Sequence, residues 1–235
     1  MRTTPLSNLF SLFMNNCLFF KQNCLLCAMP NADHGFCLPC RRDIVRMPPC
    51  CPHCAIPIPE AKQCGRCQRH LPHFDALHVH YVFCYPLNAL IHAFKYGKHF
   101  EYSGALGALI AEAPIPISEA FDIVIPVPLS KERLAERGFN QSAELAQALV
   151  NKTRHPLITN LCWRKKNTQP QAGLSFRERR KNMKGVFSVE QRLNGRSIAI
   201  VDDVVTTGAT LNALARCLKE RGAKRVEAWA LARTL

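Results

Sequence analysis

Two adjacent carboxylates followed by three threonines form the group of residues best suited to bind a charged ligand. Residues 198–210 read Ile-Ala-Ile-Val-Asp-Asp-Val-Val-Thr-Thr-Gly-Ala-Thr, so the acids end an apolar run and the hydroxyls follow the acids. Carboxylates repel phosphate but suit the diol of a ribose or a hydrated magnesium ion. Threonine hydroxyls and free backbone N–H groups suit a phosphate. The order of these side chains predicts a site for a phosphorylated sugar.

A strand and a helix on either side of this turn must position the site. The apolar residues 198–201 predict a buried strand, and Leu211, Leu214 and Leu218 recur on one face of a helix that Gly222 ends. The turn then lies at the carboxyl end of a strand and at the positive end of a helix dipole. The alternative is that the threonines only cap the helix, but capping does not require two adjacent acids at a strand end.

A proline-rich loop after the apolar residues 121–125 offers a second place for an anion. Pro126 and Pro128 stiffen this loop, and Ser130 is predicted to cap one helix whose apolar stripe reaches Val150. Basic residues in its first turns would neutralise a pyrophosphate, namely Lys131, Arg133 and Arg137. The alternative is a solvated charged face.

Eight of the thirteen cysteines form a repeat of CxxC pairs. The pattern CxxC, nine residues, CxxC occurs twice, and each cysteine of the second copy lies 27 positions after its counterpart. Four thiolates so spaced suit a tetrahedral Zn²⁺, which would supply folding free energy to a segment with almost no core. Disulfides, redox chemistry and unrelated cysteines are the alternatives. We predict one or two structural zinc ions, held by Cys24, Cys27, Cys37, Cys40, Cys51, Cys54, Cys64 and Cys67.

The repeat favours sequential pairing, in which 24/27 joins 37/40 and 51/54 joins 64/67, but crossed pairing stays open. Five neighbours lie close enough in the sequence to replace a ligand, namely Cys50, His34, His53, His70 and His73. His78 and His80 alternate in a strand predicted at 77–85, and we interpret them as half-buried strand positions rather than metal ligands. A helix is predicted to follow from Pro86 to Phe94.

The net charge of +14 predicts a polyanionic partner, such as nucleic acid, phosphates or an acidic membrane face. The strongest imbalance lies in residues 161–186, where eight Lys and Arg residues face one Glu. A polar start at 168–173 predicts a loop. If the polyanion is a nucleic acid, the residues that would contact it are Arg164, Lys165, Lys166, Arg177, Arg179, Arg180 and Lys181.

The length of 235 residues accommodates one α/β domain and a small module. We expect an N-terminal amphipathic helix at 1–23, a double zinc-ribbon module at 24–72 and an α/β domain at 73–235. No stretch approaches the ~18–20 apolar residues of a membrane span. The apolar patch in 1–23 lacks a small-residue cleavage site and is interrupted by asparagines, so a signal peptide is disfavoured and we expect a cytoplasmic protein.

Residues 198–210 resemble the phosphoribosyl pyrophosphate (PRPP) loop of type I phosphoribosyltransferases along their whole length. The resemblance implies a parallel sheet flanked by helices, in which the two acids hold the ribose and the following loop wraps the 5′-phosphate. It implies a pyrophosphate at the proline-rich loop and a mobile active-site loop in 161–186. The residues implied to bind PRPP with Mg²⁺ are Asp202, Asp203, Val204, Val205, Thr206, Thr207, Gly208, Ala209 and Thr210.

The chain from about Cys24 onward is also similar to the ComF family. The similarity rests on the double CxxC module and on the motifs Phe94-Lys95-Tyr96, Ile125–Leu129, Arg137–Gln141, Gln171–Leu174 and Arg179–Asn182. It implies a zinc ribbon before a phosphoribosyltransferase domain and a role in DNA uptake, with single-stranded DNA and DNA-uptake or recombination proteins as partners. The alternative is an active phosphoribosyltransferase that transfers ribose 5-phosphate to a nucleobase. Neither resemblance assigns a catalytic residue.

Overall fold

The computed structural model describes residues 23–30, 32–60, 62–97, 101–112, 121–165 and 185–235. The chain divides into two compact units, Met1–Asp43 and Ile44–Leu235. Each unit contains one copy of the cysteine repeat, so the second copy belongs to the same unit as the sheet. The helix expected at 1–23 lies outside the described residues, apart from its last position. Among the described helices, none combines the length and the hydropathy that crossing a bilayer requires.

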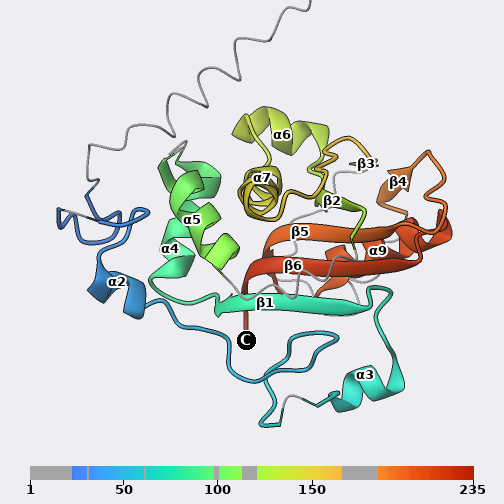
Figure 1. The fold of residues 1–235 in the computed structure, drawn as a ribbon, viewed down its shortest axis with the longest axis horizontal. Helices are drawn as coiled ribbons and strands as arrows, with labels where there is room; N and C mark the ends of the chain where they lie inside the picture. Colours follow the sequence, from blue (N-terminus) through green and yellow to red (C-terminus); the bar gives the residue numbers. More distant parts are fainter. Residues whose placement is uncertain (1–22, 31, 61, 98–100, 113–120, 166–184) are drawn as a thin grey trace, which may run out of the picture. The chain divides into compact units, whose positions relative to one another are not determined.

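A four-stranded parallel sheet forms the centre of the larger unit, with the order β1-β6-β5-β2 (Figure 1). Its strands are β1 (Ala76–Val82), β2 (Ile123–Pro126), β5 (Ser197–Val205) and β6 (Arg225–Arg233). Because β5 and β6 lie between other strands and carry side chains buried on both faces, their sequences are nearly continuous apolar runs. Asp202 and Asp203 interrupt that run only where β5 ends.

Helices cover the sheet and bring their ends to the carboxyl ends of the strands. The helix α9 (Ala209–Glu220) packs on β6, and its Leu211, Leu214 and Leu218 are buried in the same core as Ile198 and Ile200 of β5. The helices α5 (Glu101–Glu112) and α7 (Gln141–Thr153) pack against each other, and α7 also packs on β5 and β2. The helix α4 (Leu87–Tyr96) precedes them and packs against α5 (Figure 1).

The prediction of one helix from Ser130 to Val150 is wrong, because the chain forms two helices there. Ser130 caps α6 (Lys131–Arg137), its hydroxyl accepting a hydrogen bond from the N–H of Arg133 at 3.3 Å. Gly138 then adopts a left-handed conformation with φ of 80° and ends the helix. Asn140 starts α7, its side chain accepting from the N–H of Ser142 at 3.0 Å.

A short antiparallel pair, β3 (Cys162–Arg164) and β4 (Phe187–Val189), flanks the basic segment. Arg164 and Lys165 are described, whereas five of the basic residues predicted to contact nucleic acid lie outside the described residues, namely Lys166, Arg177, Arg179, Arg180 and Lys181. The loop predicted at 168–173 lies outside them as well.

Residues that precede and enter the second cysteine group run beside the outer edge of β1. The N–H of Met47 donates to the carbonyl of His80 at 2.9 Å, and the N–H of Leu77 donates to the carbonyl of Pro52 at 3.1 Å. Ala55 is fully buried in the core that contains the β5 and α9 side chains. Cys51, Cys54 and Cys67 form a small hydrophobic cluster of their own, and the adjacent Ala55 joins this segment to the main core.

Candidate functional site

A cleft of about 320 Å³ opens at the carboxyl end of β5. The two acids at the end of this strand line it, together with Thr206, Gly208, Ala209 and Thr210 of the following turn (residues 206–210), which we call the phosphate loop. Side chains from α4, α6, α7 and β3 line the cleft as well, namely Lys95, Arg133, Arg137, Gln141, Ser142 and Arg164. An open cleft next to the two acids meets the first requirement of a ligand site.

Each acid has a fixed protein partner. Asp202 Oδ1 accepts hydrogen bonds from Ser142 Oγ and from the N–H of Asp203, both at 3.0 Å. Asp203 Oδ2 forms an ion pair with Lys95 Nζ at 2.5 Å, and its Oδ1 accepts from the N–H of Val204 at 2.8 Å. Helices α7 and α4 therefore hold the two carboxylates in place from different parts of the chain.

Burial raises the pKa of Asp202 most, the neighbouring charge of Asp203 adds to this effect, and the pKa rises from 3.8 to about 7. The charge of Lys95 and the hydrogen bonds from the Asp203 N–H and Ser142 oppose this shift but do not cancel it. The environment of Asp202 therefore favours its protonated form more than water does. A bound cation or hydroxyl donor would favour its ionised form.

The side of the cleft formed by α6 and the start of α7 is rich in donors. Arg137 Nη2 donates to the hydroxyl of Tyr96 at 3.2 Å, and its guanidinium lies 5.0 Å from the centre of that ring. Gln141 is only 2% exposed, and its Nε2 has no hydrogen-bond partner among the described residues. Because a buried N–H without a partner costs free energy, its place beside the cleft indicates a ligand oxygen.

The phosphate loop leads directly into α9. Gly208 is the N-cap of the helix, has a φ of 78° that favours glycine, and offers no side chain as a cap. The Thr207 hydroxyl accepts from the N–H of Ala209 at 3.3 Å. The first turn of α9 thus lies at the cleft, where the positive end of its dipole would favour an anion.

Most of the residues predicted from the sequence line one cleft. Asp202–Thr206, Gly208–Thr210, Arg133 and Arg137 do so, whereas Thr207 lines a neighbouring pocket and Lys131 is exposed on α6. Sequence reasoning assigned no role to Lys95, Gln141 or Ser142. Lys95 and Gln141 belong to the motifs Phe94-Lys95-Tyr96 and Arg137–Gln141, which could have indicated a role in the site.

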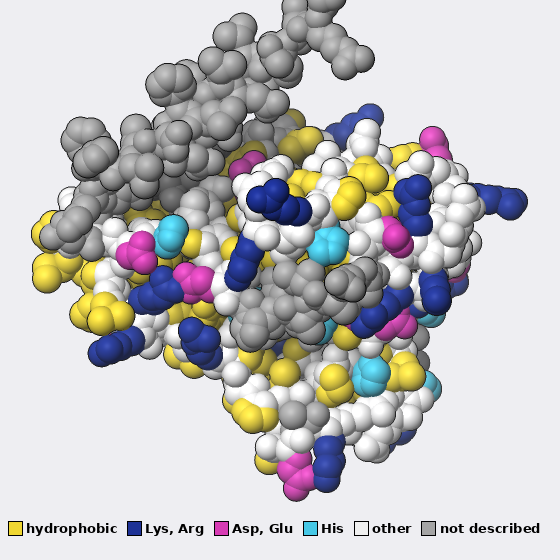
Figure 2. Space-filling model, in the orientation of Figure 1, with side chains coloured by type: hydrophobic (Ala, Val, Ile, Leu, Met, Phe, Trp, Pro, Cys, Tyr) yellow, Lys and Arg dark blue, Asp and Glu magenta, His cyan; other side chains and the backbone are white. Residues whose placement is uncertain are grey.

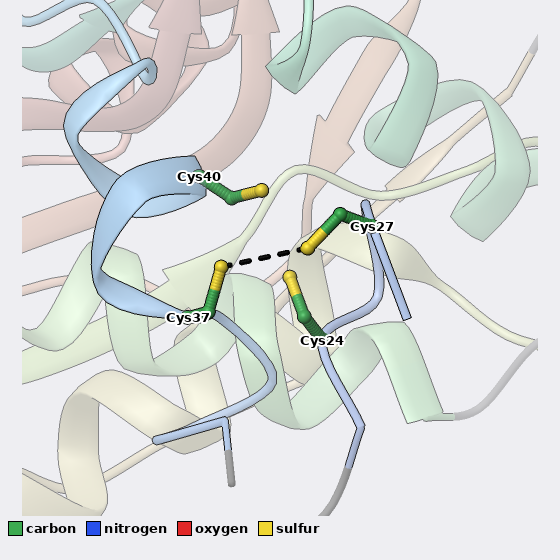
Figure 3. A group of neighbouring side chains, drawn as sticks. All are labelled: Cys24, Cys27, Cys37 and Cys40. Carbon is green, nitrogen blue, oxygen red and sulfur yellow. Dashed lines mark hydrogen bonds between the residues drawn. The ribbon is translucent and has the colours of Figure 1, made fainter. Parts of the chain in front are cut away.

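The cysteines of the first group converge on a common point. The sulfurs of Cys24, Cys27, Cys37 and Cys40 face one another (Figure 3), and all four lie within 4.8 Å of each other. The Cys27 and Cys37 sulfurs are 3.5 Å apart, close to the ~3.8 Å implied by tetrahedral Zn–S bonds of about 2.3 Å. The donor set and the spacing fit a structural Zn²⁺.

The second group, Cys51, Cys54, Cys64 and Cys67, repeats the first in backbone detail. In the first copy the N–H of Ala28 donates to the carbonyl of Cys24 at 2.8 Å, and in the second the N–H of Ala55 donates to that of Cys51 at 2.7 Å. Short helices follow the third cysteine of each copy, α2 (Leu38–Arg42) and α3 (Gly65–Arg69). The grouping is sequential, and Cys50 and the four nearby histidines are not part of it.

A buried cation lies beside the second group. Arg233, at the end of β6, is buried, and its Nη1 has no hydrogen-bond partner among the described residues. Burial lowers the pKa of Arg233, whereas the charges of Cys54, Cys50 and Cys51 raise it. Because four thiolates on one Zn²⁺ leave a net negative charge, a neighbouring arginine is suited to compensate it.

His78 and His80 do not form a metal site with the cysteines. His78 Nε2 lies 2.8 Å from Glu227 Oε2, and the same carboxylate pairs with Arg225. Burial lowers the pKa of His80 to about 4. Both residues are partly buried members of β1, in agreement with the prediction.

Comparison with known proteins places this geometry in a family. Residues 134–234 match the phosphoribosyl transferase domain. The chain is 34% identical to competence protein F of Haemophilus influenzae, covering 92% of this chain and 98% of that protein. It is 36% identical to the DNA utilization protein YhgH of Escherichia coli O157:H7, covering 90% and 97%.

Among solved structures, the glutamine PRPP amidotransferase of B. subtilis matches with 19% identity and a TM-score of 0.39 over 59% of this chain and 30% of that one. The parallel sheet flanked by helices is a type I phosphoribosyltransferase domain. From the two extended sequence matches and this domain, we conclude that the chain belongs to the ComF family of competence and DNA-utilization proteins.

Proposed function

We propose that the protein binds PRPP with Mg²⁺ in the cleft at the end of β5 and handles single-stranded DNA during DNA uptake. The observation that carries the proposal is one cleft in which two carboxylates face basic and amide donors, with a helix N-terminus beside them. These groups match the three chemically different parts of PRPP.

The ribose diol would lie at Asp202 and Asp203, because their carboxylates accept hydrogen bonds from hydroxyls. The 5′-phosphate would lie on the phosphate loop, at the positive end of α9. The pyrophosphate would then extend toward Arg133, Arg137 and Gln141, which also line the cleft. Bound Mg²⁺ neutralises pyrophosphate charge. When the ligand arrives, Lys95 would release Asp203 and become available to a phosphate oxygen.

The DNA role is supported by the names of the relatives, "competence protein F" and "DNA utilization protein", and by the net charge of +14. Basic side chains are spread over the face shown in Figure 2, with a smaller number of acidic side chains between them. A single strand bound through its phosphates would lose affinity with salt, at a log–log slope of about −0.7 per phosphate neutralised. An affinity for single-stranded DNA that does not change with salt concentration would contradict this part of the proposal.

An active phosphoribosyltransferase is the second candidate. The same donors, Arg133, Arg137 and Gln141, would stabilise pyrophosphate as it departs from the ribose. Pyrophosphate release from PRPP with a panel of nucleobases, with and without single-stranded DNA, distinguishes the candidates. Release that depends on a base supports the enzyme, and its absence with intact PRPP binding supports a binding role.

The proposal of PRPP binding is tested by isothermal titration calorimetry with Mg²⁺. We expect wild type to bind, and the double variant Asp202→Asn with Asp203→Asn to lose most of the affinity, because both diol acceptors are weakened. Glu190→Gln, which neutralises an exposed carboxylate after β4, is the matched control and should bind like wild type. Lack of binding by wild type would reject the proposal.

A further inference from the structure

A second pocket, of about 150 Å³, borders the phosphate loop. One wall comes from the second cysteine group and the segment after it, including Arg66, His70 and His73. The other wall comes from the phosphate loop and the start of α9, including Thr207 and Asn212. The pocket therefore lies between the candidate zinc centre and the loop to which we assign the 5′-phosphate.

One hydrogen bond joins these walls, and Phe74 lies close to the phosphate loop. The N–H of His73 donates to Asn212 Oδ1 at 2.7 Å. The buried ring of Phe74 lies 3.9 Å from the position that a Cβ atom on Gly208 would occupy. The segment after the second cysteine group is thus fixed against the phosphate loop, and the pocket is part of the folded unit.

The size and the walls of the pocket suit one flat ring. A cavity of about 150 Å³ holds a benzene molecule in a well-studied case. Leu71, Pro72 and Phe74 provide apolar surface here, and His70 and His73 add exposed imidazoles. Bases of single-stranded nucleic acid stack on surfaces of this kind without strong sequence preference.

The pocket and the PRPP cleft meet at the same two residues, Gly208 and Ala209. The 5′-phosphate of PRPP is a monoester. The rest of the PRPP molecule is therefore attached to one side of this phosphate only. A phosphodiester carries a nucleoside on each side of its phosphate. A phosphate loop with one cavity on each side therefore accommodates a polynucleotide backbone as well as PRPP.

Building on the proposed function, we propose that the phosphate loop also binds a phosphodiester of single-stranded DNA, with one base in the pocket beside the second cysteine group. DNA and PRPP then compete for the same loop. PRPP binding would release DNA, and the small ligand would act as a signal that controls DNA handling.

The test is fluorescence anisotropy of a labelled oligothymidylate with the full chain, purified under reducing conditions. We expect Mg²⁺–PRPP to displace the oligonucleotide competitively. Thymidine monophosphate, which has a monoester phosphate, should compete far less well than an unlabelled oligonucleotide. Equal competition by the mononucleotide would overturn the assignment to a polynucleotide.

Variants locate the base. Leu71→Ala, and separately the pair His70→Ala with His73→Ala, should weaken oligonucleotide binding at least about fivefold, the loss of one stacked base. Calorimetric PRPP affinity should stay unchanged. Leu38→Ala is the matched control, because Leu38 and Leu71 are both leucines with 61% exposure.

The failures of this inference and of the proposed function are distinguishable. Oligonucleotide binding that PRPP does not reduce, or that the Leu71 and histidine variants do not weaken, overturns the inference alone. Absence of any oligonucleotide binding overturns the inference and the DNA part of the proposed function, but leaves PRPP binding intact.

Discussion

At the scale of single residues, two side chains of the candidate site lie in environments that cost folding free energy when no ligand is bound. The pKa of Asp202 is raised to about 7, and Gln141 has a buried donor with no partner among the described residues. Such groups reduce stability when they lack partners, and a ligand bound in the cleft would supply partners. The acids could be predicted from their position after an apolar run. The raised pKa of Asp202 and the unpaired donor of Gln141 could not, because both depend on tertiary packing.

PRPP binding should release a proton below about pH 7. The folded pKa of Asp202 is raised to about 7 from an ordinary 3.8, so this carboxyl favours the folded state at low pH, and that contribution is lost as the pH rises from about 4 to 7. If the ligand needs the carboxylate, affinity falls as the pH drops below 7. Calorimetry at pH 6.5 in buffers of different ionisation enthalpy measures the released proton. Asp202→Asn should lack this release, and an unchanged value would contradict the assignment.

Gln141→Leu should change stability and binding in opposite directions. Removing a buried donor without a partner should raise the free energy of unfolding by about 1 kcal/mol, while PRPP affinity falls by about 1.5 kcal/mol or more, the value of a hydrogen bond to a charged group. Chemical denaturation and calorimetry measure the two effects. Gln147→Leu, at an exposed position of α7, is the control. Higher stability without loss of affinity would place Gln141 outside the ligand site.

At the scale of elements, local patterns predicted the strand, turn and helix of residues 198–222 well, because one short segment contains all the signals. The break between α6 and α7 was missed, although Gly138 and Asn140 are a helix end signal and a cap signal. The apolar stripe crosses the break and concealed it. Lys95 reaches Asp203 only through tertiary packing, so no local pattern could have predicted that ion pair.

The packing of α5 against α7 depends on a residue without a side chain. A Cβ atom on Gly107 would lie 2.7 Å from the Cβ of Ala148, which is too close for two carbon atoms. Gly107→Ala should therefore cost about 1–3 kcal/mol of stability. Gly104 lies on the same helix, and a Cβ atom there would meet no other atom within 4 Å. Gly104→Ala should therefore raise the free energy of unfolding by up to about 1 kcal/mol. Urea denaturation of both variants checks the contrast, and equal effects would contradict the close approach.

At the scale of the whole molecule, the duplicated cysteine pattern predicted two equivalent groups but not their different structural settings. One group lies in the unit Met1–Asp43, and the other shares the core of the sheet through Ala55. Nothing in the spacing distinguishes the copies, because the difference comes from residues that pack around them. The positions of the basic residues in 166–184 lie outside the described residues, so their role in DNA binding stays a prediction.

Loss of zinc from the two groups should have unequal consequences. Cys54→Ser should destabilise the sheet by several kcal/mol, because the neighbouring Ala55 belongs to the main core. Cys27→Ser should remove one zinc per chain with little effect on the sheet. Metal analysis gives the zinc content, and fluorescence of the fully buried Trp229 follows unfolding of the sheet. Equal shifts in the unfolding midpoint would contradict the different settings of the two groups.

The position of β6 in the sheet has a consequence for biosynthesis. This strand pairs with both β1 and β5, yet it follows every other described strand in the chain. During translation, the edge strand β1 is made well before β6, the strand that joins it to β5. Strands without their neighbours expose apolar surface. We therefore expect chaperones to bind the nascent chain before β6 is synthesised. A chain truncated before β6 would lack the strand that joins β1 to β5, so we expect it to be degraded by proteases.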